Sequence, residues 1–415
     1  MKRQPLRNLV TLAVSAVLFV ASQASAQGTS IDFWYAISGK AGETLQSMLQ
    51  EFNSTNEFGI TVNGTFSGSY GDTAQKVLAA LAANSLPAGG LVPAGPLWTC
   101  REGNYLLEEY MAGPEGLPED HFFPVLLDYN RYGGHLCSLP FNNSTMVMFY
   151  NKDLMAQAGL DPSAPPQTWD ELLDQAKTIA KAVPGSIGVE VRDEGWWLKG
   201  LILQNGGAIV TDDASGPAFQ EPAGVQALEF WKTLVDQGLM PPAQHDVSRD
   251  LFVAGRVAFL MASTATLGTV QDGAAFAYGT DLLPGKAERG STVGGAALVM
   301  FPSTPEKELA TWRLLKWLTS AENSARFTEA TGYVPTGPDA ASTDIVRSLI
   351  QEEPAYAAGF DQLAVSSQYP HFFEMGTMDN LLADAIEFVE LGVKTPQQAL
   401  DDAANGLIKE ISSNQ

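Results

Sequence analysis

Strand-like and helix-like segments alternate along this chain, and that alternation constrains its fold more than any other feature. Residues 30–34 have the apolar pattern of a short strand, and residues 43–52 carry apolar side chains at helical spacing. The same pair of patterns recurs at 60–66 and 72–84. A βαβα order favours a parallel sheet, because each helix carries the chain back to start the next strand. The sequence therefore predicts an α/β fold.

A second α/β unit is predicted later in the chain. Residues 146–150 form a strand pattern, and residues 151–158 follow as a helix. Thr168 and Glu171 have the spacing of a capping box, which marks the start of a helix. Further helix starts of this kind lie at 304–305 and 395–398.

The length of 415 residues predicts two domains, since one domain usually holds ~100–200 residues. The sequence contains no repeat and no Pro- or Ser-rich linker between its two α/β units. We therefore expect a chain that crosses between its domains more than once.

The first 26 residues resemble an export signal. Basic residues lie near the start, an apolar run covers 9–21, and Ala24 and Ala26 have the spacing of a cleavage site. The apolar run is shorter than the ~20 residues that span a bilayer. We expect cleavage after Ala26 and release into a periplasm, with an uncleaved anchor as the alternative. No Cys follows the apolar run to carry a lipid.

The net charge of −23 argues against binding to nucleic acid or to an anionic membrane surface. Cys100 and Cys137 are the only cysteines. In an oxidising compartment they could form a disulfide worth ~3–4 kcal/mol, or they could be two buried free thiols. The four histidines lack the spacing of metal ligands, so we predict no metal site.

Motifs of catalysis are missing from the sequence. It has no Gly-x-Ser-x-Gly elbow, no phosphate-binding P-loop and no His-Glu-x-x-His pair. We therefore predict no catalytic residues and no cofactor. The 47 acidic residues leave room for a glycosidase-like carboxylate pair, so a secreted carbohydrate-active enzyme is the alternative of another class.

Several aromatic residues lie beside glycines near predicted loop ends. They are Tyr35, Tyr70, Trp196, Trp197 and Tyr333. Aromatic rings stack against the C–H faces of sugars and polyols, although each ring could equally belong to the core. Adjacent Trp196 and Trp197 cannot both face the same way, so at least one should be buried.

A longer set of motifs resembles a known family. The segments are Phe-Asn-Asn-Ser-Thr at 141–145, Tyr-Asn-Lys-Asp at 150–153, Ala-Gly-Leu-Asp at 158–161 and the Pro-Pro-x-Thr-Trp run ending at Trp169. Segments 33–35, 294–296, 332–335 and 394–400 match in the same order. The chain resembles the extracellular solute-binding proteins of ABC importers, and most closely the subgroup that binds glycerol 3-phosphate and glycerophosphodiesters.

The resemblance implies a type II periplasmic-binding-protein fold, in which two α/β lobes enclose a ligand cleft. By this resemblance, lobe one holds residues 27–138 and 262–320, and lobe two holds 139–261 and 321–415. The implied ligand contacts are Tyr35, Tyr70, Ser144, Trp196, Trp197, Gly295 and Tyr333. Ser144 would offer a hydroxyl and Gly295 a backbone N–H, although Ser144 could instead serve a local turn.

Two positions depart from the subgroup. Its phosphate-gripping Arg corresponds to Glu374 here, and its glycerol-binding Glu corresponds to Ala94. Like charges ~4 Å apart cost ~4 kcal/mol at an effective dielectric of ~20. Free glycerol 3-phosphate is therefore disfavoured, whereas a carboxylate suits a neutral polyol, glycoside or sugar, or a cationic head group. Arg192 and Lys199 could restore positive charge, or they could be ordinary surface residues.

These features predict a monomeric periplasmic receptor that closes over a polyhydroxylated solute and delivers it to the transmembrane subunits of an ABC permease. A glycerol-3-phosphate-binding protein proper is the nearest alternative. A subunit that presents its solute to a chemoreceptor is a third possibility.

Overall fold

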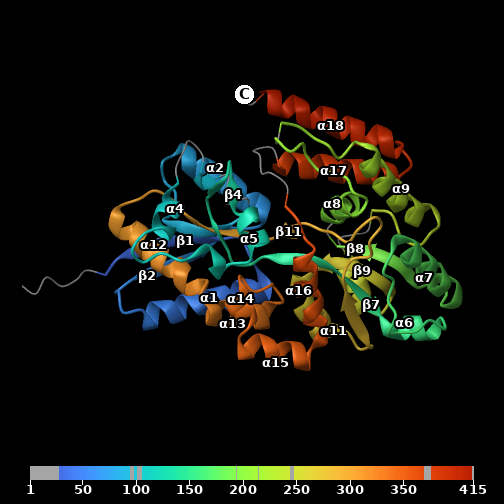
Figure 1. Ribbon diagram of the computed structural model, residues 1–415, viewed down its shortest axis with the longest axis horizontal. Helices are drawn as coiled ribbons and strands as arrows, with labels where there is room; N and C mark the ends of the chain where they lie inside the picture. Colours follow the sequence, from blue (N-terminus) through green and yellow to red (C-terminus); the bar gives the residue numbers. More distant parts are fainter. Residues whose placement is uncertain are drawn as a thin grey trace, which may run out of the picture.

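The protein consists of two α/β lobes, as its computed structural model shows (Figure 1). The structure describes residues 28–93, 98–100, 105–192, 194–213, 215–243, 247–368 and 375–413. The predicted export signal, Ala94 and Glu374 lie outside these residues. The predicted two-lobed α/β fold is confirmed.

Lobe one is built on a sheet with the strand order β2-β1-β3-β12-β6. β1 lies parallel to both β2 and β3, as the βαβα pattern predicts, whereas β12 is antiparallel to its neighbours. The strands are β1 (Ser30–Tyr35), β2 (Thr61–Phe66), β3 (Gly89–Val92), β6 (Leu139–Pro140) and β12 (Ala297–Met300).

Both faces of this sheet are covered, because side chains alternate along β1. Phe33 faces the core that α1 and α12 enclose, and Trp34 faces the side of α2. The helices of this lobe are α1 (Gly39–Thr55), α2 (Tyr70–Ala82), α4 (Leu106–Met111), α5 (Pro124–Tyr129), α12 (Pro305–Leu318), α13 (Ala321–Thr331) and α14 (Pro338–Ala341). The 3₁₀ turn η2 (Glu119–His121) and the hairpin of β4 (Arg131–Tyr132) and β5 (His135–Leu136) complete it.

Lobe two is built on a sheet with the order β10-β7-β9-β8, and β11 also pairs with β7. All eight residues of β7 are buried, since helices cover both sides of the sheet. The strands are β7 (Ser144–Asn151), β8 (Ile187–Val191), β9 (Val257–Ser263), β10 (Tyr278–Asp281) and β11 (Val293–Gly294).

The helices of lobe two form two layers. One layer contains α6 (Lys152–Gln157), α7 (Trp169–Ala182), α8 (Glu194–Gln204), α9 (Pro222–Asp236), α17 (Met375–Glu390) and α18 (Pro396–Ser413). The other contains α10 (Ser248–Val253), η4 (Thr264–Thr266), α11 (Leu267–Gly273), α15 (Asp344–Glu352), η5 (Pro354–Tyr356) and α16 (Ala357–Ala364).

The predicted helix starts are present, with one difference. The Thr168 hydroxyl accepts the backbone N–H of Glu171, but the Glu171 carboxylate reaches back to the N–H of Gln167, one residue before the cap. Thr395 and Gln398 form both bonds of a capping box, at 3.2 and 3.3 Å.

The lobe boundaries differ from those predicted. β10 pairs with β7, so residues 278–281 belong to lobe two although they lie within the range predicted for lobe one. Conversely, α13 packs on α1 and belongs to lobe one. Local sequence marks these segments as strand and helix but does not specify which sheet they join. The lobes meet at residues 141–145, 292–296 and 331–336, which we call the junction (Figure 1).

Cys100 and Cys137 form a disulfide, with their Cα atoms 5.4 Å apart. Of the two alternatives left by the sequence, the structure therefore has the bonded pair. Within the described ranges, no helix combines the length and the apolar character needed to cross a membrane.

Candidate functional site at the junction

The three stretches of the junction are joined by a small set of hydrogen bonds. The backbone N–H of Val334 donates to the carbonyl of Asn143 at 2.9 Å, and the Asn143 amide donates to the carbonyl of Gly294 at 3.3 Å. The Asn142 side-chain oxygen accepts the N–H of Ala296 at 3.1 Å. Asn142 and Asn143 therefore hold together segments that lie far apart in the sequence.

Tyr70 connects this network to lobe one. It opens α2, where Ser69 and Asp72 form a capping box, and its ring is partly exposed. The Asn142 amide donates to the Tyr70 hydroxyl at 3.3 Å. One asparagine side chain thus bonds both to lobe one and to the segment that returns from lobe two.

Two glycines allow close contact at the junction. Gly295 has a φ of +125°, and a Cβ there would lie 2.3 Å from the carbonyl oxygen of Asn142. The carbonyl of Gly295 accepts the hydroxyl of Tyr129 at 2.6 Å. A Cβ on Gly294 would lie 2.9 Å from the Trp196 ring, so this ring of lobe two packs directly on the junction.

Strand ends of both sheets face this region. In lobe two, β7 begins at Ser144, next to the ends of β9 at Ser263 and of β8 at Val191. In lobe one, the parallel strands β1 and β2 end at Tyr35 and Phe66. Ligands of α/β proteins usually bind at the carboxyl ends of the strands, so the junction is where a site is expected.

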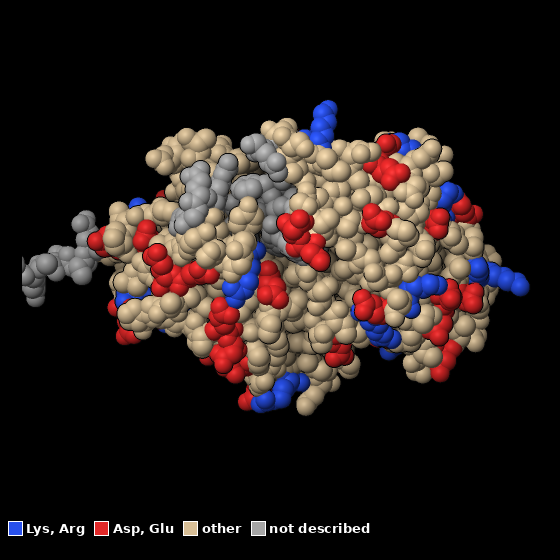
Figure 2. All heavy atoms as spheres, turned by 45° about the horizontal axis from the view of Figure 1, so that its top comes forward, with Lys and Arg blue, Asp and Glu red and all other residues tan. Residues whose placement is uncertain are grey.

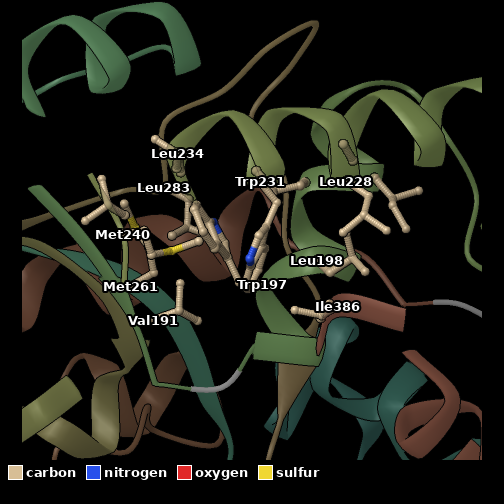
Figure 3. Close-up of a cluster of buried hydrophobic side chains, with 14 of the residues drawn as sticks. Val191, Trp197, Leu198, Leu228, Trp231, Leu234, Met240, Met261, Leu283 and Ile386 are labelled. Atoms are coloured by element: carbon tan, nitrogen blue, oxygen red, sulfur yellow. The ribbon is translucent and has the colours of Figure 1, made fainter. Parts of the chain in front are cut away.

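The two adjacent tryptophans have different roles. Trp196 is partly buried, and its indole N–H donates to the carbonyl of Thr292 in the junction at 3.0 Å. Trp197 is 1% exposed and packs against Trp231 with ring centroids 4.9 Å apart (Figure 3). The prediction of Trp197 as a ligand contact is therefore corrected. Its ring lies in the core of lobe two, because one step along a helix turns a side chain by about 100°.

Tyr35 is also buried in a core. Its ring lies among the packed side chains of lobe one, 5.9 Å from the ring of Phe66. The expected contact between Tyr35 and a ligand is not supported, whereas Phe66 is about half exposed beside it. Tyr333 lies in the junction, partly buried, and stacks on Phe327 at 5.7 Å.

Lys199 is buried, which excludes the surface alternative for this residue. Its ammonium forms an ion pair of 2.9 Å with Asp379, whose side chain is half exposed. Lys199 lies one helical turn after Trp196, and Asp379 lies near the start of α17. Arg192 is partly buried at the end of β8. The wall of lobe two next to Trp196 thus contains a cation that is already paired with a carboxylate.

A family model for bacterial extracellular solute-binding proteins matches residues 47–358. This chain belongs to the bacterial extracellular solute-binding protein family. Members of this family work in ABC importers and bind solutes without converting them, so the alternative of a carbohydrate-active enzyme is excluded. Their place of action is extracellular or periplasmic, and they work with permease subunits.

Relatives of this solute-binding protein include the sn-glycerol-3-phosphate-binding periplasmic protein UgpB of Escherichia coli. It is 29% identical over 94% of each chain. Solved structures with the same fold include UgpB from Mycobacterium tuberculosis in complex with glycerophosphocholine, with a TM-score of 0.80, 23% identity, and coverage of 94% of this chain and 99% of that one. An ABC transporter solute-binding protein from Thermotoga lettingae bound with α-D-tagatose gives a TM-score of 0.76 and 26% identity over 92% and 100% of the chains.

Sequence reasoning did not select Asn142 and Asn143 as candidate site residues of this solute-binding protein. Both are fully buried, and together they hold the junction. A signal was present, because the motif at 141–145 contains two adjacent amides, and amide side chains that are buried require hydrogen-bond partners. Among the described residues, no group of His, Cys, Asp and Glu is placed to hold a metal ion.

Proposed function

We propose that this solute-binding protein captures a polyhydroxylated solute at the junction and delivers it to its ABC permease. The solute would be a glycerophosphodiester, glycoside, polyol or sugar. We further propose that the protein acts as a monomer in the periplasm, after removal of residues 1–26.

One observation carries this proposal: Asn142 ties Tyr70 of lobe one to the junction, while Trp196 of lobe two packs on Gly294 of the same junction. A solute placed there would contact both lobes. Such a solute would favour the closed form of the protein, because only in that form would it contact both lobes at once.

The chemistry of the junction favours hydroxyl-rich solutes. The side-chain oxygen of Asn143 is buried and accepts no hydrogen bond within the described part of the chain. A buried acceptor without a donor costs about 1–3 kcal/mol, which a solute hydroxyl would recover. The partly exposed rings of Tyr70 and Phe66 offer apolar faces for the C–H groups of the same solute.

A panel of glycerophosphodiesters, polyols, glycosides and oligosaccharides tests the proposal by thermal shift and tryptophan fluorescence. We expect at least one compound to bind with a micromolar or lower Kd, which corresponds to about −8 kcal/mol. The solute class is wrong if no compound in the panel binds.

The two tryptophans provide a matched test of the site. Trp196→Ala should weaken binding of the best compound at least tenfold, while Trp197→Phe should lower the free energy of unfolding and leave the Kd unchanged. Equal effects of both variants on the Kd would place the solute elsewhere.

A variant at Glu374 distinguishes two classes of solute: free glycerol 3-phosphate, and a solute that is phosphate-free or a phosphodiester. If it occupies the position of a phosphate-gripping Arg, Glu374→Arg should strengthen binding of glycerol 3-phosphate by up to roughly a thousandfold. Tight binding of glycerol 3-phosphate by the unmodified protein, with no change in the variant, would favour a glycerol-3-phosphate-binding protein proper.

A further inference from the structure

A cavity of ligand size lies in lobe one, lined by residues of α4 and α12 and apart from the junction. Its volume is about 460 Å³, within the ~300–1,000 Å³ typical of small-molecule sites. Leu106, Tyr110, Leu309 and Trp312 supply its apolar lining. We call this cavity the α4–α12 groove.

Three carboxylates surround this apolar lining. Glu115 is already matched, because it accepts two bonds from the Arg313 guanidinium at 2.6 and 3.1 Å. Glu109 and Glu308 form no ion pair within the part of the chain that the structure describes. One oxygen of Glu308 accepts the backbone N–H of Ser303 at 2.8 Å, and this bond restrains the position of the carboxylate. A second cation lies here, because the ammonium of Lys316 donates to the backbone carbonyl of Glu115 at 2.6 Å. The three carboxylates therefore outnumber the two cations by one, beside an apolar surface.

Tyr110 lines the same groove, near these two carboxylates. Burial raises the pKa of the Tyr110 phenol, and the charges of Glu308 and Glu109 raise it further. The phenol therefore stays neutral, and its ring offers an electron-rich face inside a negative field. Trp312 lies behind it, with ring centroids 6.1 Å apart. An aromatic face next to carboxylates is the environment that stabilises an organic cation.

We propose that the α4–α12 groove binds a small organic cation, consisting of an ammonium group on an apolar body about the size of one aromatic ring. The apolar body fills the space over Leu106 and Leu309, and the ammonium lies between Glu109 and Glu308. A neutral molecule of the same shape loses the attraction of both carboxylates, and an anion is repelled by them. This site is independent of the proposed solute site at the junction.

Two probes of matched shape test the proposal by calorimetry at low salt: phenethylammonium, and the neutral 2-phenylethanol. We expect the cation to bind at least tenfold more tightly than the alcohol. The double variant Glu109→Gln/Glu308→Gln should lose that preference. Its far-UV circular dichroism spectrum should match that of the unmodified protein, because a glutamine at 308 can still accept the N–H of Ser303.

Glu306→Gln is the matched control, because Glu306 is an exposed carboxylate of the first turn of α12 that does not line the groove. It should bind phenethylammonium as the unmodified protein does, as should Trp196→Ala. If the control and the double variant lost the same affinity for phenethylammonium, the net charge of the protein would explain the preference for the cation, and the proposed site would be wrong.

Two further outcomes would also overturn the proposal. One is an equal affinity for phenethylammonium and 2-phenylethanol, which would show that the groove binds apolar groups without recognising the positive charge. The other is a short apolar peptide with one lysine that binds at this groove more than tenfold tighter than phenethylammonium, which would make the groove a docking surface for a polypeptide.

Discussion

Gly295 shows how a single residue determines the contact between two lobes. Its φ of +125° lies outside the range that residues with a Cβ adopt, and the added atom would also collide with the backbone of Asn142. The sequence marked Gly295 only through a family resemblance. Neither its dihedral angle nor the nearby carbonyl can be inferred from neighbouring residues.

Gly295→Ala should lower the free energy of unfolding by roughly 1–3 kcal/mol from backbone strain alone, with a further cost from the collision. Urea denaturation measures this change. Gly134→Ala is the control, because Gly134 also has a positive φ, of +86°, but a Cβ there would meet no atom within 4 Å. The control should lose less stability, and equal losses in both variants would contradict the role of the junction carbonyl.

Trp196 and Trp197 are adjacent in the sequence but differ in burial. Their adjacency alone required that they face different ways, and that part of the prediction is confirmed. Which of them enters the core depended on Trp231 and the surrounding side chains, which come from α9 and the sheet (Figure 3).

Among the elements, α12 illustrates how a helix is attached to the rest of its lobe. Arg313 binds Glu115 of the segment after α4, and its guanidinium also lies 3.9 Å from the centre of the Phe58 ring. The bonds from Arg313 hold the pKa of the Glu115 carboxyl below its ordinary value of 4.5. A lowered pKa means that folding favours the ionised carboxylate.

The contribution of this pair to stability should therefore depend on pH in a defined direction. It is fully present above pH 4.5 and is lost as the pH falls through the lowered pKa. At pH 7, Glu115→Gln should lower the free energy of unfolding by roughly 0.5–1 kcal/mol, since both side chains are partly exposed. The difference from the unmodified protein should shrink as the pH falls below 4.5, and it should vanish once the pH lies well below the lowered pKa.

Urea denaturation at pH 7, 5 and 3 gives the free energy of unfolding of the unmodified protein and of Glu115→Gln. Asp236→Asn is a suitable control, because it removes an exposed ion pair between neighbours on one helix, where we expect little change at any pH. A stability loss in Glu115→Gln that persists unchanged at pH 3 would show that packing, rather than charge, accounts for it.

The element β10 explains why the predicted lobe boundaries were wrong. It adds to the edge of the second sheet by antiparallel pairing with β7, before the chain returns to lobe one through β12. A strand pattern predicts that a segment pairs but not which partner it finds, because backbone hydrogen bonds are the same for every partner.

At the scale of the whole molecule, acidic side chains are spread over both lobes rather than gathered in one patch, on the face that Figure 2 shows. This distribution agrees with the net charge of −23. The proposed recognition of a solute therefore relies on particular groups at the junction, since the broad surface charge is shared by both lobes.

A solute that contacts both lobes should stabilise them together. At a concentration 100 times its Kd, it should add about 2.7 kcal/mol to the apparent free energy of unfolding. Differential scanning calorimetry should then show the transitions of both lobes moving to higher temperature. A shift in only one of two transitions would place the solute within a single lobe and contradict binding at the junction.

The sequence by itself determined the α/β class, the parallel pairing of the first strands, most helix starts and the family. These features depend on periodicity and on residues close in the chain, which one sequence records directly. Tertiary structure alone decided that Cys100 bonds to Cys137, that Trp197 enters the core, and that Asn142 joins Tyr70 to Ala296. Each of these depends on contacts between segments far apart in the sequence, whose distance and direction are set only when the two lobes have packed.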